Sequence, residues 1–241
     1  MRVLDVVDLH YYPQGKGIFE NGGVAAPTRK RRSGAFARRA RCGTPTTSTS
    51  RGSREKIRLI PRLKEIIAEN YPGRGISIGE WDFGAEGHIA GALALAEVLG
   101  PLRSRRRHLG LLLDGAQAEF LPAYWAFRAT AISTGMAAVL GPLRGNQRAD
   151  ELVAVRLERR SGQHLVAILL NFSHDNGLKA KIDLSSCGTV GLATRRSATT
   201  GQPGGFGEPK TASWTGGGVI EESVPPYSIT CVRRVAGRRR P

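Results

Sequence analysis

The sequence is poor in cysteine and in acidic residues, and it contains no long apolar run. Its three cysteines, Cys42, Cys187 and Cys231, include no close pair, which excludes a CxxC metal pattern and a readable disulfide framework. No apolar run approaches the roughly 18 residues of a membrane span. The apolar start of the chain, LDVVDL, is interrupted by aspartates and does not have the form of a signal peptide. We therefore expect no membrane partner, and the localisation is left open.

Several motifs of common enzyme classes are also missing. The chain has no Walker loop, no dinucleotide-binding glycine fingerprint and no Gly-x-Ser-x-Gly elbow. These absences argue against a nucleotide-binding enzyme and against a serine hydrolase of the α/β type.

The basic charge is concentrated in short tracts. Thirty-six basic residues face twenty acidic ones, a formal net charge of +16 that is typical of nucleic-acid-binding proteins. Fourteen of the basic residues lie in three tracts, at 29–41, 103–107 and 238–240, and the rest of the chain is close to neutral. A basic arm that binds phosphates is one alternative. Because the charge does not belong to a folded face, we expect no nucleic-acid partner.

The first part of the chain has the pattern of a parallel α/β layer. Strand-like runs at 3–9 and 76–79 alternate with helix-like segments at 55–70 and 88–99. In the first of these helices, helical spacing puts one apolar face on the inside, formed by Leu59, Leu63, Ile66 and Ile67. A further helix is predicted at 122–128, PAYWAFR.

From Leu152 the pattern changes to short strands separated by Gly, Pro and Ser turns, which is typical of a β-sandwich. The predicted fold is therefore α/β plus all-β, with a boundary near 145–150 and domains at 1–148 and 149–241. Two stretches, 27–54 and 101–121, lose all periodicity, and we expect them to be disordered. One hypothesis is that they are frameshifted translations, since GC-rich codons read out of frame give Arg, Ala and Gly. The encoding DNA tests this, because the hypothesis requires a continuous alternative frame across 27–54.

Chemically useful side chains follow the two predicted strands. His10, Tyr11 and Tyr12 end the first strand, and Glu80, Trp81 and Asp82 end the second. In a barrel of parallel strands, active-site groups lie where strands end. A carboxylate beside aromatic rings suits a carbohydrate substrate, since rings stack on sugar faces and a carboxylate can attack an anomeric carbon.

Each of these residues also has a structural interpretation. Glu80 could be a helix-cap partner or a surface charge, and His10 could be a hydrogen-bonded core residue. Trp81, Tyr124 and Trp125 could be core packing or a sugar platform. Glu86 and His88 could form a metal pair, but they lack the His-Glu-x-x-His spacing, which favours capping of the following helix.

Four blocks of the sequence together resemble glycoside hydrolase family 44: LDVVDLHYYPQG, EKIRLIPRLKEIIAENYPG, SIGEWDFGAEGHIAGALALAEVLG and PAYWAFR. The resemblance implies the C-terminal half of a TIM-like (β/α)8 barrel followed by a β-sandwich. It further implies a retaining endo-β-1,4-glucanase that acts on cellulose or xyloglucan-like polysaccharides.

The resemblance also assigns roles to individual residues. The family's strand ending in Ile-Thr-Glu-Tyr-Asn carries its nucleophile, and here it reads Ile78-Gly79-Glu80-Trp81-Asp82. Glu80 is thereby identified as the catalytic nucleophile. His10, Tyr12 and Trp81 are expected to bind substrate.

One part of the family's machinery is missing from the chain. The family's acid/base glutamate lies in an Asn-Glu-Pro setting, which occurs nowhere in this sequence. We therefore expect a truncated, inactive form of a parent enzyme that is itself secreted. A polysaccharide substrate, a monomer and no cofactor are expected, with a structural calcium left open. The remaining alternative is a non-catalytic glycan-binding protein.

Overall fold

The structure of the chain is a computed structural model. It describes residues 4–12, 59–81, 85–103, 108–112, 121–131, 136–139, 152–159, 164–183, 193–200, 205–207, 210–213 and 219–235. The predicted disordered stretch at 27–54 lies outside these residues.

The first part of the chain forms a small parallel sheet. Its strands are β1 (Val6–Tyr11), β2 (Gly75–Trp81) and β3 (His108–Leu112), in the order β1-β2-β3. Helix α3 (Leu59–Asn70) precedes β2, and helix α4 (Ile89–Arg103) connects β2 to β3. This confirms the predicted strand–helix–strand–helix order, and the sheet is open in the part of the chain that the structure describes.

Two details of this layer differ from the prediction. In α3, Ile60 and Ile67 are buried, and Leu59 and Leu63 pack against the same core as predicted, whereas Ile66 is 45% exposed. The stretch 101–121 was expected to lack structure. Residues 104–107 and 113–120 of it lie outside the described residues, whereas α4 continues to Arg103 and β3 pairs with β2 over several residues. The arginine tract between α4 and β3 interrupts the hydrophobic periodicity, so this strand cannot be predicted from the local pattern.

The second part is antiparallel. Helix α5 (Pro122–Ala131) leads into a six-stranded sheet of order β4-β5-β6-β11-β8-β9, and a separate pair is formed by β7 and β10. The bounds of these strands are β4 Met136–Val139, β5 Leu152–Arg159, β6 His164–Asn171, β7 Leu178–Asp183, β8 Ala193–Thr199, β9 Lys210–Ser213, β10 Val219–Val224 and β11 Ser228–Val235.

The helix at α5 and the strands β5, β6, β7, β10 and β11 follow the sequence prediction. Strands β8 and β9 were not predicted. Strand β4 lies before the predicted boundary at 145–150, yet it pairs with β5. Because β4 is paired with β5, the antiparallel sheet begins before the domain boundary that the sequence predicts.

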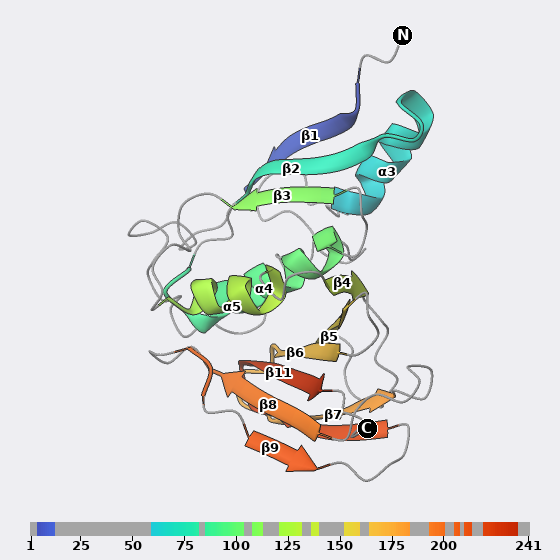
Figure 1. Ribbon diagram of the computed structural model, residues 1–241. Coiled ribbons are helices and arrows are strands. Elements are labelled where there is room, and N and C mark those ends of the chain that lie inside the picture. Colours follow the sequence, from blue (N-terminus) through green and yellow to red (C-terminus); the bar gives the residue numbers. More distant parts are fainter. Residues whose placement is uncertain are drawn as a thin grey trace, which may run out of the picture.

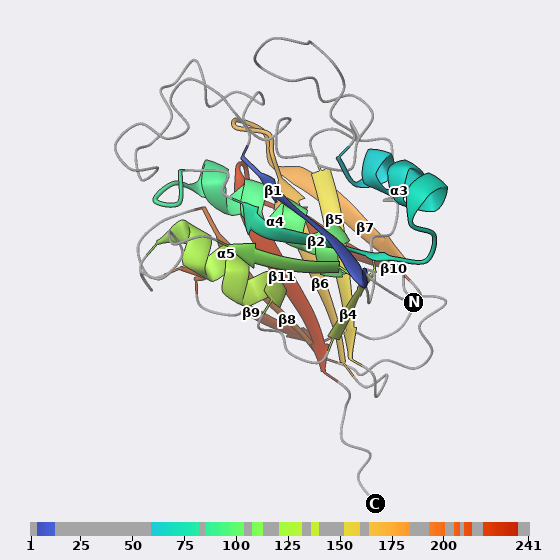
Figure 2. The same ribbon diagram turned by 90° about the horizontal axis from the view of Figure 1, so that it is seen from above.

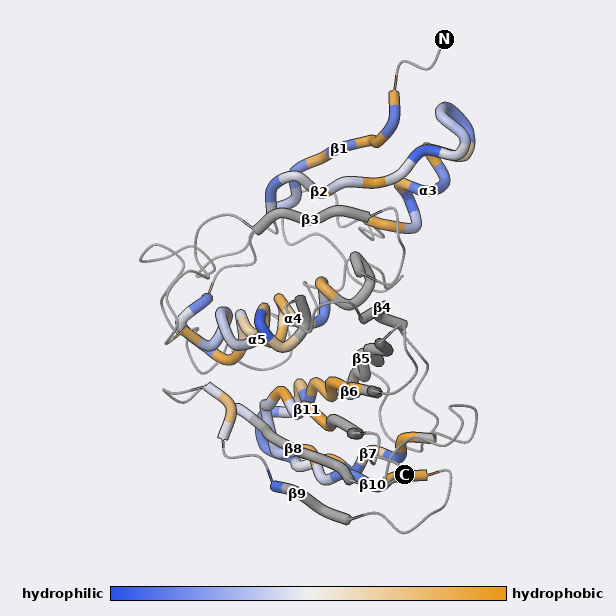
Figure 3. Tube along the Cα trace, viewed as in Figure 1, coloured by the Kyte–Doolittle hydropathy of each residue, from blue (hydrophilic) through white to orange (hydrophobic). Residues whose placement is uncertain are grey.

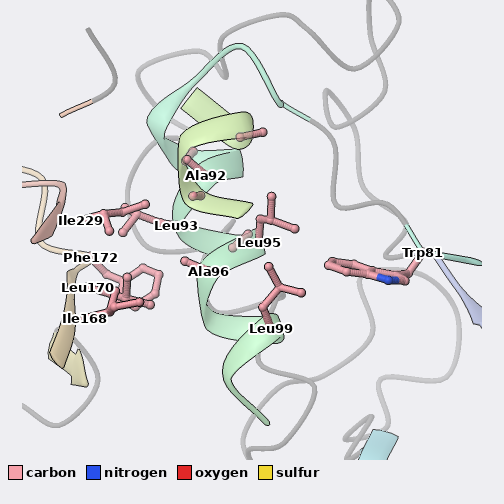
Figure 4. Close-up of a cluster of buried hydrophobic side chains, with 14 of the residues drawn as sticks. Trp81, Ala92, Leu93, Leu95, Ala96, Leu99, Ile168, Leu170, Phe172 and Ile229 are labelled. Atoms are coloured by element: carbon pink, nitrogen blue, oxygen red, sulfur yellow. The ribbon is translucent and has the colours of Figure 1, made fainter. Parts of the chain in front are cut away.

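Helix α4 lies between the two sheets and joins them into one core (Figure 1). Seen from above, the parallel sheet lies over α4 and over the strands of the antiparallel sheet (Figure 2). In Figure 4, Leu95 and Leu99 extend from α4 toward Trp81 of β2, whereas Leu93 extends toward Ile229 of β11. All five belong to one buried cluster. A helix that is apolar all round is a buried helix, which explains the sequence IAGALALAEVL.

The central residues of strand β6, Val166 to Leu170, are buried, and this part of the strand is hydrophobic in Figure 3. Ile168 and Leu170 face α4, whereas Ala167 and Leu169 form a second cluster with residues of β7 and β10. A strand covered on both sides needs a continuous apolar run instead of an alternating one. The run LVAILL meets that need, so the order of layers is parallel sheet, helices, six-stranded sheet and two-stranded sheet.

We predict that Leu93→Ala destabilises the whole chain. Leu93 is fully buried where α4 contacts the antiparallel sheet, and its truncation leaves a cavity between the layers. A loss of about 2–5 kcal/mol in the free energy of unfolding is expected, measured by guanidinium denaturation. Ile66→Ala, on the exposed side of α3, is the matched control and should change stability by no more than about 0.5 kcal/mol. Equal effects in the two variants would contradict this packing.

The described helices include none with the length and apolar content that crossing a membrane requires. Of the cysteines, Cys231 on β11 lies in the described part, where it has no disulfide partner. Burial raises the pKa of its thiol to about 12, which keeps the sulfur protonated at neutral pH.

Candidate active site

The side chains of His10 and Glu80 meet at the carboxyl end of the parallel sheet. Strands β1 and β2 are parallel neighbours, and His10 lies directly opposite Glu80 in their register. The Nδ1 atom of His10 is 3.1 Å from Oε2 of Glu80. This confirms the prediction that the two residues lie on adjacent parallel strands with their side chains at the same end.

Tyr12 completes the set of groups around this carboxylate. Its hydroxyl donates a hydrogen bond of 2.8 Å to the same atom, Oε2 of Glu80. Within the described part of the chain, Oε1 of Glu80 has no hydrogen-bond partner. One carboxylate oxygen is thus held from two directions, and the other is left available.

The site is accessible to solvent. The side chains of His10 and Glu80 are 52% and 42% exposed. The imidazole pairs with the carboxylate as an ion pair when it is protonated, or as a hydrogen-bond donor in the Nδ1–H tautomer when it is neutral. A half-exposed, oriented carboxylate can reach a bound substrate without opening the core.

The position of Glu80 depends on a β-bulge in β2. Leu9 pairs with Ile78, and His10 pairs with Glu80, so β2 contains one extra residue, Gly79. The ladder to β3 shows the same surplus, since two steps along β3 correspond to three steps from Ile78 to Trp81. A bulge of this kind re-aims the side chains that follow it.

Trp81 is part of the core, and its predicted role in binding substrate is corrected. The side chain is 1% exposed and faces Leu95 and Leu99 of α4 (Figure 4). The bulge puts Trp81 on the same face as Ile76 and Ile78, away from Glu80. A ring that is covered in this way has no face on which a sugar could stack.

The other aromatic candidates also pack within the protein. A side chain at Gly205 would overlap the ring of Trp125, so the glycine backbone lies directly against the indole. The guanidinium of Arg128 lies 5.6 Å from the centre of the Trp125 ring, and Tyr124 meets that ring edge-on. Trp125 therefore belongs to the junction between α5 and the antiparallel part, and the packing interpretation holds for it.

His88 acts as a helix cap. Its Nδ1 accepts a hydrogen bond of 3.1 Å from the backbone N–H of Ala90 at the start of α4. Glu86 is buried, and its backbone carbonyl accepts a hydrogen bond from Ala123 of α5. Within the described residues, no group of three or more His, Cys, Asp or Glu side chains could hold a metal ion. Asp82 lies outside the described residues.

The bulge at Gly79 and the contact of Asp8 with it were not predicted from the sequence. Glu80 was expected in a loop after a strand ending at 79, whereas the strand continues to Trp81. A glycine inside a strand often marks a bulge or a close approach of another group, and this signal was present in the sequence. Asp8 precedes His10 by two residues on β1, and its carboxylate lies against Gly79.

Comparisons with known proteins identify similar glycoside hydrolases. No family model matches the chain. The chain is 32% identical over 116 residues to the β-mannanase/endoglucanase A of Caldicellulosiruptor saccharolyticus, covering 41% of this chain and 9% of that protein. It is similar to the structure of CelM2, a bifunctional glucanase-xylanase from a metagenome library, with a TM-score of 0.75 and 26% identity, covering 98% of this chain and 44% of that chain. It is also similar to a xyloglucanase of glycoside hydrolase family 44 from Paenibacillus polymyxa, with a TM-score of 0.75 and 20% identity, covering 97% of this chain and 47% of that chain.

The chain therefore resembles glycoside hydrolases of the endoglucanase type. In particular, its resemblance to glycoside hydrolase family 44 is confirmed, with structures of that family among its neighbours. The chain spans less than half the length of the solved structures, and under a tenth of the length of the mannanase/endoglucanase.

Proposed function

We propose that this chain carries the nucleophile half of a retaining endo-β-1,4-glucanase, with Glu80 as the nucleophile. The observation that supports this most directly is the asymmetry of the Glu80 carboxylate. Oε2 is held by Tyr12 and His10, whereas Oε1 has no partner among the described residues. A nucleophile that is fixed through one oxygen can present the other to an anomeric carbon in a defined direction.

The proposed first step is a displacement at the anomeric carbon. Oε1 of Glu80 forms a bond to that carbon while the glycosidic C–O bond breaks, and the bonding electrons leave with the departing sugar oxygen. In a complete enzyme a general acid protonates that oxygen, and the same residue then removes a proton from the water that releases the sugar. Tyr12 and His10 hold the carboxylate in place during both steps.

The relatives support a proposal for the substrate and for the wider architecture. We propose a β-1,4-linked glucan of the cellulose or xyloglucan type, since the similar structures are described as a glucanase-xylanase and a xyloglucanase. The three parallel strands would correspond to part of a barrel, and the antiparallel part to a β-sandwich. A monomer without a cofactor is proposed, and the site residues as described include no metal ligand set.

The test uses a substrate analogue that does not need the general acid. 2,4-Dinitrophenyl 2-deoxy-2-fluoro-β-cellobioside has a leaving group that departs without protonation, and its fluorine slows hydrolysis of the covalent intermediate. Residues 1–241 should gain the mass of one fluorocellobiosyl group, and peptide mapping should place it on Glu80. Absence of labelling, or a label on another residue, would overturn the proposed role of Glu80.

A further inference from the structure

The space beside the bulge is filled by a carboxylate. A Cβ atom built on Gly79 would lie 2.6 Å from Oδ2 and 3.0 Å from Oδ1 of Asp8. An ordinary carbon–oxygen contact begins near 3.4 Å, so any side chain at this position would have to displace Asp8, the strand or both. A side chain at 79 would therefore compete for space with the carboxylate of Asp8, which is the exposed and flexible end of that side chain.

The bulge decides on which face of β2 Glu80 lies, because successive side chains of a strand alternate between its two faces. Ile76 and Ile78 are both 2% exposed and face the core. With strict alternation, the next residue on that face would be the carboxylate of Glu80, directed at α4. Because Gly79 is absorbed as the extra residue of the bulge, Trp81 takes the core position, and Glu80 comes to lie opposite His10.

We propose that Gly79 and Asp8 act as a pair of positioning residues for Glu80. The carboxylate of Asp8 fills the notch that Gly79 leaves, and this fit holds the bulge in the place that aims Glu80 at His10 and Tyr12. The relevance to catalysis rests on the proposed function of Glu80, whereas the positioning itself does not.

Displacing Asp8 would disturb the site by either of two routes. If Asp8 keeps its rotamer, β2 must move away from β1 and carry Glu80 with it. If Asp8, whose side chain is exposed, changes rotamer, one of the directions open to it is toward His10, two residues along the same face of β1. There it would compete with Glu80 for the imidazole.

The experiment is a double-mutant cycle in residues 1–241, with Gly79→Ala, Asp8→Ala and the two together. The first readout is the rate of labelling by 2,4-dinitrophenyl 2-deoxy-2-fluoro-β-cellobioside. Gly79→Ala should slow labelling by about 10²-fold, the scale expected for a misplacement of about 1 Å. The double variant should recover most of this loss, because the methyl group then occupies the notch that the carboxylate has left.

Two controls separate positioning from general damage. Gly177→Ala is the matched glycine variant, since a Cβ there would meet its nearest atom at an ordinary 3.6 Å, and it should label like the parent chain. Guanidinium denaturation should show that Gly79→Ala still unfolds cooperatively. If Gly79→Ala labels at the parent rate, or if the double variant is as slow as Gly79→Ala, the inference is wrong.

A second readout does not depend on labelling. The 15N chemical shift of His10 Nδ1, at fixed pH, reports the contact with Glu80, and Glu80→Gln calibrates its loss. Gly79→Ala should move this signal toward that of Glu80→Gln, and the double variant should return it. If the parent chain is not labelled but this pattern is seen, the positioning inference stands and the proposed function fails. An unchanged signal in Gly79→Ala would overturn the inference.

Discussion

Glu80→Gln is expected to abolish covalent labelling by the fluorocellobioside. The amide keeps the shape of the side chain and an oxygen that can accept the hydrogen bond from Tyr12, but its nitrogen and carbonyl oxygen are far weaker nucleophiles than a carboxylate oxygen. Loss of a covalent nucleophile slows hydrolases by on the order of 10⁴-fold or more. The variant should therefore show no mass gain on the time scale in which the parent chain is fully labelled.

The matched control for this change lies on the antiparallel part. Glu221 on β10 is exposed and forms an ion pair of 3.0 Å with Lys181 on β7. Glu221→Gln removes the same charge far from the site, and exposed ion pairs contribute little to stability. This variant should label at the parent rate. Labelling that persists in Glu80→Gln would show that another group is the nucleophile.

The packing of the interior could be predicted from sequence where burial leaves a periodic or continuous apolar signal. Helix α4 and strand β6 are examples, because each is covered on opposite sides and each is apolar over most of its length. Strand β3 could not be predicted in the same way. It is short and follows an arginine tract, and its place is set by pairing with β2, a long-range interaction that local periodicity does not report.

Less of the site than of the interior could be predicted from the sequence. The meeting of His10 and Glu80 follows from two parallel strands that end at the same edge, so it could be predicted. The bulge could not, because an extra residue is defined only against a partner strand. That single residue decides which of Glu80 and Trp81 faces the core, and missing it led to the wrong role for Trp81.

Residues 1–241 alone are not expected to hydrolyse carboxymethylcellulose or xyloglucan above the rate of Glu80→Gln. Retention requires two carboxyl groups about 5–5.5 Å apart, and an alkoxide leaving group requires protonation. The chain has no Asn-Glu-Pro motif, and the described contacts of Glu80 are with His10 and Tyr12. Loss of general acid catalysis is worth about 10²–10⁴-fold.

The same chain should, however, act on 2,4-dinitrophenyl β-cellobioside when azide is added. This aryl leaving group departs without a proton, so Glu80 can form the glycosyl intermediate unaided. Water then attacks slowly, since no base removes its proton, whereas azide is already an anion and needs none. Dinitrophenolate release should rise with azide concentration, and the product should be β-cellobiosyl azide, because two inversions give retention. Polymer hydrolysis well above the Glu80→Gln level, with no response to azide, would instead mean that the chain supplies its own acid/base. Asp8, which lies on the Glu80 face of the sheet, would then be the first residue to replace.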